Sequence, residues 1–215
     1  HKVQRYLDAL APWGLRPRGA GLTLGEVGAK GAVCEAKRVL LIQSAFLGDT
    51  LLTLPLARDA RTALPGARLT VLTLPSMVEL FKGSSWIDAV LVDDKRGAHA
   101  GLRGPWKLAG ELKKHGFDLA IIPHRSFRSA LVAYLAAIPR RVGFSSSAGR
   151  WLLTDRVPFT WLMHDLERNL ALLKPLVRGL RLRDDESVYL SSPPASRARV
   201  DARLPEAGVP RGAVV

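Results

Sequence analysis

The stretch that decides the fold is residues 38–56, RVLLIQSAFLGDTLLTLPL. Its first part, residues 38–43, is a short and nearly continuous apolar run, which is typical of a strand buried on both faces of a sheet. A turn follows at residues 44–50. Apolar residues then recur at helical spacing over residues 51–64, until Pro65 ends the pattern. The stretch therefore predicts a strand, a turn and a helix.

The same alternation of strand and helix continues along the chain. Further strands are predicted at residues 68–74, 89–93, 118–123 and 141–144, and further helices at residues 76–81, 105–115 and 126–138. Strands that alternate with helices indicate parallel strands joined by crossover connections. We therefore expect an α/β fold with a parallel sheet of at least five strands.

The pattern is weaker beyond residue 144. We expect an irregular stretch through Trp151 and Pro158, and then a long helix over residues 164–180 that Pro175 bends. A last short strand at residues 188–190, a linker at 191–194 and a polar helix at 195–208 are further expectations.

These elements suggest a domain over residues 38–190. Residues 1–37 are rich in glycine and lack periodicity, so we expect a poorly ordered leader there. Residues 191–215 are expected to be a linker and the start of another domain. Because the chain opens on His1 and stops where a strand begins, we expect it to be a fragment.

The charge balance points to an acidic partner. Lys and Arg number 32 against 19 Asp and Glu, a net charge of +13. Nucleic acid, an anionic membrane surface and an anionic small substrate all fit this charge, as does a merely Arg-rich surface. The chain shows no helix-turn-helix, RNA-binding or zinc signature, and the charges form no basic tail.

The single cysteine and the apolar runs limit the cellular setting. Cys34 excludes an intrachain disulfide and favours a reducing, cytosolic compartment. The longest apolar run, residues 130–138, is about half of the 18 or more residues that a spanning helix needs. Any contact with a membrane is therefore expected to be peripheral.

The turn after the first predicted strand is the first candidate site, because ligands bind beyond the carboxyl ends of parallel strands. It has neither the glycine pattern of a dinucleotide site nor the lysine of a P-loop, which counts against a nucleotide hydrolase. Asp49 in this turn is either a helix N-cap or a general base. A base at a helix start is expected to take its proton late in the reaction.

A second candidate site follows the strand at residues 118–123. Arg125 and Arg128 lie one turn apart at the start of a helix, which suits recognition of phosphate or carboxylate. They are equally compatible with two solvated arginines. His124 is interpreted as structural, since no set of metal ligands accompanies it.

Several motifs in order give the chain a resemblance to the ADP-heptose:lipopolysaccharide heptosyltransferases, glycosyltransferase family 9. The most specific is Gly48-Asp49 followed by an apolar helix with Pro55. The others are Pro65-Gly66-Ala67, residues 117–120, residues 126–130, residues 138–143, and His164 with residues 167–173. The Ser-Phe-Arg-Ser-Ala stretch at residues 126–130 most resembles the enzymes that add the second heptose.

The resemblance implies the N-terminal half of a GT-B fold, in which two Rossmann-like domains face a cleft. Residues 38–190 match the acceptor-binding domain. ADP-heptose is then the donor substrate, bound mainly by the other domain, and no cofactor is implied. The fragment alone is expected to be inactive.

The resemblance also implies a metal-independent, inverting transfer with Asp49 as the general base. Gly48, Arg128 and Arg150 are implied to bind the acceptor, which is Kdo-bearing lipid A or the heptosylated inner core. Arg125 and Ser126, at the same helix start, complete the expected substrate-binding set, although His124-Arg125 departs from the family pattern. The setting implied is the cytoplasmic face of the inner membrane, with no nucleic acid. A relative transferring another sugar and a basic nucleic-acid-binding module are the alternatives.

Overall fold

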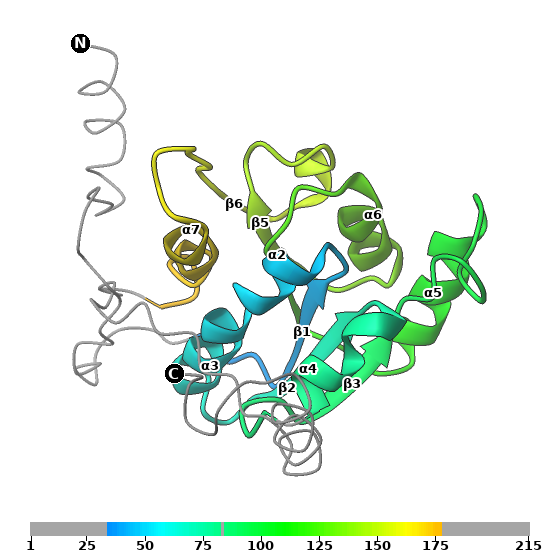
Figure 1. Cartoon of the computed structure of the whole chain (residues 1–215), viewed down its shortest axis with the longest axis horizontal. Helices are drawn as coiled ribbons and strands as arrows, with labels where there is room; N and C mark the ends of the chain where they lie inside the picture. Colours follow the sequence, from blue (N-terminus) through cyan, green and yellow to red (C-terminus); the bar gives the residue numbers. More distant parts are fainter. Residues whose placement is uncertain (1–33, 83, 178–215) are drawn as a thin grey trace, which may run out of the picture.

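A six-stranded parallel sheet forms the centre of the domain (Figure 1). The computed structural model describes residues 34–82 and 84–177. Within them the strand order is β3-β2-β1-β4-β5-β6. The strands are β1 (Arg38–Gln43), β2 (Arg68–Thr73), β3 (Ala89–Val92), β4 (Leu119–Ile122), β5 (Arg140–Phe144) and β6 (Asp155–Val157). The predicted parallel α/β sheet is confirmed.

Helices cover both faces of this sheet. One core contains residues of α3 (Leu54–Ala63), α4 (Val78–Lys82) and α7 (Asp165–Ala171). The other contains residues of α5 (Gly104–Lys113) and α6 (Phe127–Leu135). The remaining elements are α2 (Leu47–Leu51) and two single 3-10 turns, η2 (Pro75–Met77) and η3 (Arg150–Leu152).

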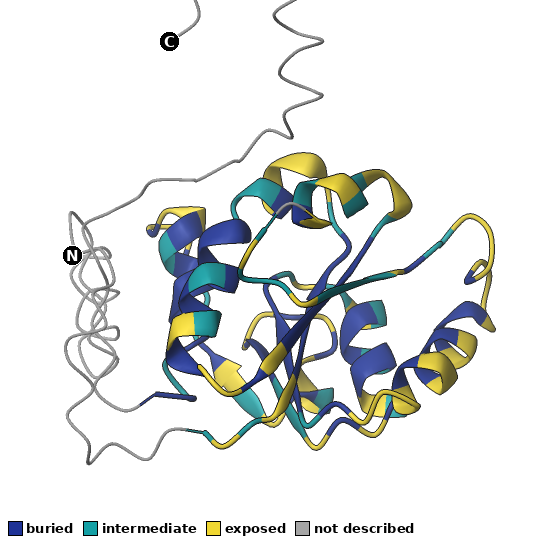
Figure 2. Cartoon of the chain, turned by 90° about the horizontal axis from the view of Figure 1, so that it is seen from below, coloured by how far each residue is buried: buried dark blue, intermediate teal, exposed yellow. Residues whose placement is uncertain are grey.

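Strand β1 shows why its sequence is apolar at almost every position. Val39 and Leu41 belong to one core, whereas Leu40 and Ile42 belong to the other. Successive side chains of a strand point to opposite faces, so a strand covered on both sides needs apolar residues throughout. Figure 2 shows the strands buried between helices whose outer faces are exposed.

The helix predicted over residues 51–64 is two helices, α2 and α3. The first begins earlier than predicted and ends at Leu51, and the second has Pro55 in its first turn. A proline inside a continuous helix has no N–H to donate and clashes with the carbonyl four residues back, which here belongs to Leu51. The break at residues 52–53 avoids both penalties.

The irregular stretch predicted after residue 144 contains the edge strand β6. It pairs in parallel with β5, placing Asp155 beside Val142 and Val157 beside Phe144. Its sequence gives no apolar run, because Asp155 and Arg156 precede the single apolar residue Val157. An edge strand can carry such side chains, so periodicity did not reveal it.

The helix predicted over residues 164–180 is shorter in the structure. His164 caps α7 by accepting the N–H of Leu166 at its Nδ1, and the helix ends at Ala171. Pro175 therefore bends no helix, since its ring would clash with the carbonyl of Ala171 in a continued one. The expectations for residues 1–33 and 178–215 lie outside the described residues.

No helix in the described part of the chain is long and apolar enough to cross a membrane. Cys34, near the start of that part, donates its backbone N–H to the carbonyl of Leu176 at 3.2 Å. The two ends of the described chain thus meet beside the core.

Candidate active site

The carboxyl edge of the sheet gathers the polar residues that the sequence singled out. Strand β1 has β2 on one side and β4 on the other. The strands that follow β1 in sequence are thus added first on one side of it and then on the other. Such a topological switch point opens a crevice between the two strand ends. The turn after β1 and the turn after β4 therefore flank the place where a ligand is expected.

The turn after β1 is held rigidly through its backbone. The carbonyl oxygen of Asp49 accepts hydrogen bonds from Gln43 Nε2 at 3.1 Å and from Thr53 Oγ1 at 2.7 Å. Gln43 Nε2 also lies 2.6 Å from Thr53 Oγ1, and Gln43 Oε1 accepts the N–H of Ala45. These bonds fix where Asp49 lies before any substrate arrives.

The carboxylate of Asp49, by contrast, is free. The residue is exposed, and none of the described residues makes a hydrogen bond or ion pair with its carboxylate oxygens. Asp49 is also not the N-cap of α2, because Phe46 holds that position and Asp49 lies within the first turn. The N-cap interpretation is therefore wrong, and no described residue holds the carboxylate.

Gly48 lies next to Asp49 and its missing side chain leaves open space. A Cβ added there would meet no atom within 4 Å, and the residue has no left-handed backbone conformation. Neither packing nor backbone geometry within the described residues thus requires glycine at this position. Space beside the carboxylate is what the glycine provides.

Lys95 lies behind the same turn and was not identified from the sequence. Its Nζ donates to the backbone carbonyl of Ser44 at 2.8 Å. Burial lowers the pKa of Lys95, the carboxylate of Asp93 counteracts this, and the positive charge of Arg128 adds to the lowering. The run Asp93-Asp94-Lys95-Arg96 at the end of the third predicted strand was the signal that could have revealed it.

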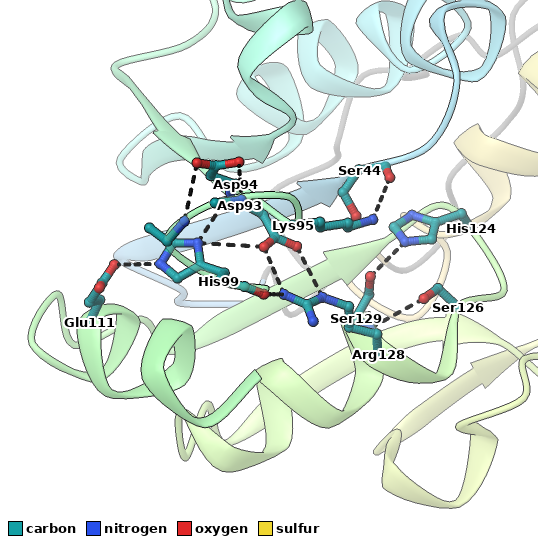
Figure 3. A network of polar contacts seen from close by, with 12 residues as sticks. Ser44, Asp93, Asp94, Lys95, His99, Glu111, His124, Ser126, Arg128 and Ser129 are labelled. Carbon is teal, nitrogen blue, oxygen red and sulfur yellow. Dashed lines mark hydrogen bonds and ion pairs between the residues drawn. The ribbon is translucent and has the colours of Figure 1, made fainter. Parts of the chain in front are cut away.

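Arg128 is tied to residues that follow β3 (Figure 3). Its Nε and Nη2 donate to the two carboxylate oxygens of Asp93 at 3.3 and 2.9 Å, and Nη2 also donates to the carbonyl of His99 at 3.0 Å. Asp93 is 3% exposed. The guanidinium therefore neutralises a buried carboxylate, and within the described chain only Nη1 is left without an acceptor.

His99 extends this network to α5. It is buried, accepts the N–H of Asp94 at Nδ1 over 3.2 Å, and has Nε2 3.1 Å from Glu111 Oε2. Its Nδ1 also lies 3.6 Å from Asp93 Oδ1, so the ring lies between two carboxylates. The loop after β3 is thereby fixed to both α5 and α6.

His124 and Ser126 have local roles at the start of α6. The hydroxyl of Ser126 caps the helix by accepting the N–H of Ser129, while His124 Nε2 lies 2.7 Å from the hydroxyl of Ser129. Burial lowers the pKa of His124 to about 4, and the charge of Lys95 contributes. His124 is thus neutral at pH 7, in accord with a structural role.

Arg125 points away from Arg128, towards the residues after β6. Its guanidinium carbon lies 4.5 Å from the ring centre of Phe159 and 4.8 Å from that of Trp161. Cation–π contacts of this kind hold an arginine in place while leaving its N–H groups available. The structure does not bring Arg125 and Arg128 together, so a joint anion site formed by the two is not present.

Arg150 lies on the η3 turn, and Ala148 just before this turn donates its N–H to the carbonyl of Arg125 at 3.2 Å. The guanidinium carbon of Arg150 is 5.8 Å from the ring of Trp151, which in turn lies beside Phe127. Its neighbours are therefore aromatic, and its contact with substrate stays a prediction.

A groove of about 610 Å³ runs alongside the turn of Asp49. It lies between the exits of β1, β2 and β3, and its lining is mainly apolar, with the charged residues Asp94, Lys95 and Arg96 after β3. The residues that matter most are Phe46, Leu47, Leu74, Met77, Lys95 and Arg96. The described residues contain no group of three or more His, Cys, Asp or Glu side chains placed to hold a metal ion.

The model of glycosyltransferase family 9 (heptosyltransferase) matches residues 105–214, half of the chain. The chain belongs to glycosyltransferase family 9. A search among curated proteins found no match.

Solved structures of this family have the same fold. A family 9 glycosyltransferase from Veillonella parvula has a TM-score of 0.70 at 22% identity, covering 81% of this chain and 51% of that one. Heptosyltransferase II from E. coli has a TM-score of 0.58 at 20% identity, with the same coverage. E. coli WaaC bound to ADP-2-deoxy-2-fluoro heptose has a TM-score of 0.57 at 20% identity, covering 70% of this chain and 50% of that one.

The chain spans about half the length of these solved structures. They are GT-B glycosyltransferases, so the predicted Rossmann-like half of a GT-B fold is confirmed, as is the predicted family.

Proposed function

We propose that this family 9 protein acts in an inverting glycosyltransferase that moves heptose from ADP-heptose to the inner core of lipopolysaccharide, with Asp49 as the general base. The observation that carries the proposal is the exposed, unpartnered carboxylate of Asp49 on a turn that Gln43 and Thr53 hold in place. A positioned base at a topological switch point is what acceptor activation needs.

In the proposed step, the acceptor hydroxyl approaches the space beside Gly48. Its oxygen attacks the anomeric carbon of the heptose while the bond to ADP breaks, and Asp49 takes the hydroxyl proton as that proton becomes acidic. Attack opposite the leaving group inverts the anomeric centre. We assign no metal ion to this step, and we place most of the donor contacts on a second domain.

Basic side chains at the same edge of the sheet as Asp49 would bind the anionic groups of the acceptor. Arg125 is the best placed of the predicted arginines, because two aromatic rings hold it and its N–H groups have no acceptor among the described residues. Arg128 offers only Nη1, and Ser126 is engaged in its helix cap. Lys95 and Arg96 line the neighbouring groove and join the proposed set. Arg150, on the turn beside the start of α6, is its remaining member.

The lipid-linked acceptor and the charge of +13 support a place at the anionic cytoplasmic face of the inner membrane. We assign no role to nucleic acid, because the positive charge comes with no recognition motif for it.

A transfer assay on the intact protein tests the proposal. ADP release is followed with ADP-heptose and a Kdo-bearing lipid A acceptor, and with ADP-glucose as an alternative donor. Asp49→Asn should lower kcat at least a hundredfold with little change in the KM for donor, since general bases contribute about 10²–10⁴ in rate. An Asp49→Asn protein that keeps most of its activity would refute the base assignment, and faster transfer from ADP-glucose would refute the donor.

A further inference from the structure

A second pocket lies at the other end of the sheet from Asp49. Its volume is about 310 Å³, and it is formed where β1, β2 and β3 begin, next to the end of α5. The basic residues that line it are Arg38, Arg68, Lys114 and His115. No proposed catalytic or acceptor contact involves this edge.

The charged side chains that line the pocket are all basic. None of its described lining residues is a carboxylate. The two acidic residues nearby are engaged elsewhere. Asp118 accepts the backbone N–H groups of Lys37 at 2.8 Å and Arg38 at 3.2 Å. Asp88 is close enough to Arg68 to feel its charge, but its carboxylate accepts the N–H of Leu69 and pairs with Arg61.

The walls of the pocket are positioned by contacts of their own. Arg38 Nη1 donates to the carbonyl oxygen of His115 at 2.7 Å, and the His115 ring stacks on Phe117 with centroids 5.6 Å apart. The other side-chain N–H groups of Arg38 make no hydrogen bond with the described residues. The side chains of Arg68 and Lys114 have no hydrogen-bond acceptor in the described part of the chain.

Two of these cations are direct neighbours in the sheet. Arg38 and Arg68 are register partners on β1 and β2. Two positive charges held side by side in this way repel each other. A bound anion would remove this repulsion and gain charge-assisted hydrogen bonds from both guanidinium groups.

We propose that this pocket binds a phosphate group. Arginine presents paired N–H donors that match phosphate oxygens, Lys114 adds a third positive charge, and Thr70 lines the floor. The volume lies at the lower end of the roughly 300–1,000 Å³ that ligand pockets occupy, which suits a single phosphate or a lipid headgroup and not a sugar nucleotide. The pocket is independent of the transfer chemistry proposed for the opposite edge.

The first test measures thermal unfolding in increasing inorganic phosphate, with chloride keeping the ionic strength constant. A ligand that binds only the folded state raises Tm in a saturable way. The double variant Arg68→Gln, Lys114→Gln should weaken phosphate binding at least tenfold. The control Arg103→Gln, Lys107→Gln removes the same charge from exposed residues at the start of α5 and should bind as the wild type does.

The second test distinguishes the source of the phosphate. It is co-sedimentation with vesicles of phosphatidylcholine, with and without one fifth phosphatidylglycerol. If a lipid headgroup is the ligand, the wild type should bind the anionic vesicles. The pocket variant should then lose this binding, and the control variant should keep it. A phosphate response without this vesicle preference supports a soluble phosphate compound. Equal losses in both double variants, or no response to phosphate or to either vesicle, would overturn the proposal.

Discussion

The guanidinium of Arg128 donates to both carboxylate oxygens of Asp93, a residue 35 positions earlier that is 3% exposed. The pair joins the first turn of α6 to the loop after β3, and so fixes two of the segments that border the proposed acceptor site. The sequence predicts Arg128 as a ligand contact at a helix start. In the structure it also holds together two segments that border the proposed acceptor site.

Arg128→Ala should therefore lower the free energy of unfolding. Removing one partner of a buried ion pair costs about 3–5 kcal/mol, and we expect the low end because 23% of the Arg128 side chain is exposed. Urea unfolding measures this loss, and Arg128→Lys should lose less because the charge remains. Unchanged stability together with a higher KM for acceptor would instead give Arg128 a purely substrate-binding role.

Gly48→Ala should fold as well as the wild type. The added methyl group meets no atom within 4 Å, and alanine favours a helix over glycine by up to about 1 kcal/mol. If the acceptor occupies this space, kcat/KM should nevertheless fall at least tenfold. Thermal unfolding and the transfer assay, run on the same preparation, separate the two effects. Full activity of Gly48→Ala would mean that the acceptor does not approach here.

His124 should make the fold sensitive to mild acid. Burial lowers the pKa of His124 to about 4 in the folded protein. Between this pH and about 6.5, the ordinary histidine pKa, the unfolded chain therefore binds more protons than the folded protein does. Stability is therefore retained near pH 7 and lost as pH falls from about 6.5 to about 4. We expect His124 to contribute on the order of 2 kcal/mol of this loss between about pH 6.5 and 4.5.

The control for this prediction is His124→Gln, which cannot be protonated. Urea unfolding at several pH values should show a shallower acid slope for the variant. Identical slopes would mean that carboxylates alone cause the acid sensitivity.

Arg125 and Trp161 should affect acceptor binding more than folding. Arg125 is exposed and Trp161 is 73% exposed, so substitution of either should leave the thermal midpoint nearly unchanged. Arg125→Gln should raise the KM for an anionic acceptor about tenfold. Trp161→Ala should raise it a few-fold, because an exposed cation–π contact is worth about 0.5–1 kcal/mol.

Trp106→Ala is the matched control for Trp161→Ala, since Trp106 is also exposed but lies on α5. Steady-state kinetics with a phosphorylated and a dephosphorylated acceptor measure the effect. An Arg125→Gln protein with an unchanged KM for both would remove Arg125 from the acceptor site.

Much of the fold was predictable because its signals are local. Residues 38–43 are apolar at nearly every position, and this property requires a strand covered on both faces whatever its neighbours are. The succession of strands and helices then limits the sheet to parallel pairing. Strand β6 escaped prediction because Asp155 and Arg156 suit an edge strand, and the edge exists only once β5 is in place.

The sequence by itself determined that Asp49 follows a buried strand and begins a helical segment. Only the tertiary structure decided that its carboxylate is free, because the groups that hold its turn bond to its backbone carbonyl. The sequence likewise shows Arg125 and Arg128 only as two arginines one helical turn apart, and the tertiary structure decided their different contacts. Their partners Asp93 and Trp161 follow different strands near opposite edges of the sheet, and spacing along one helix carries no information about such distant contacts.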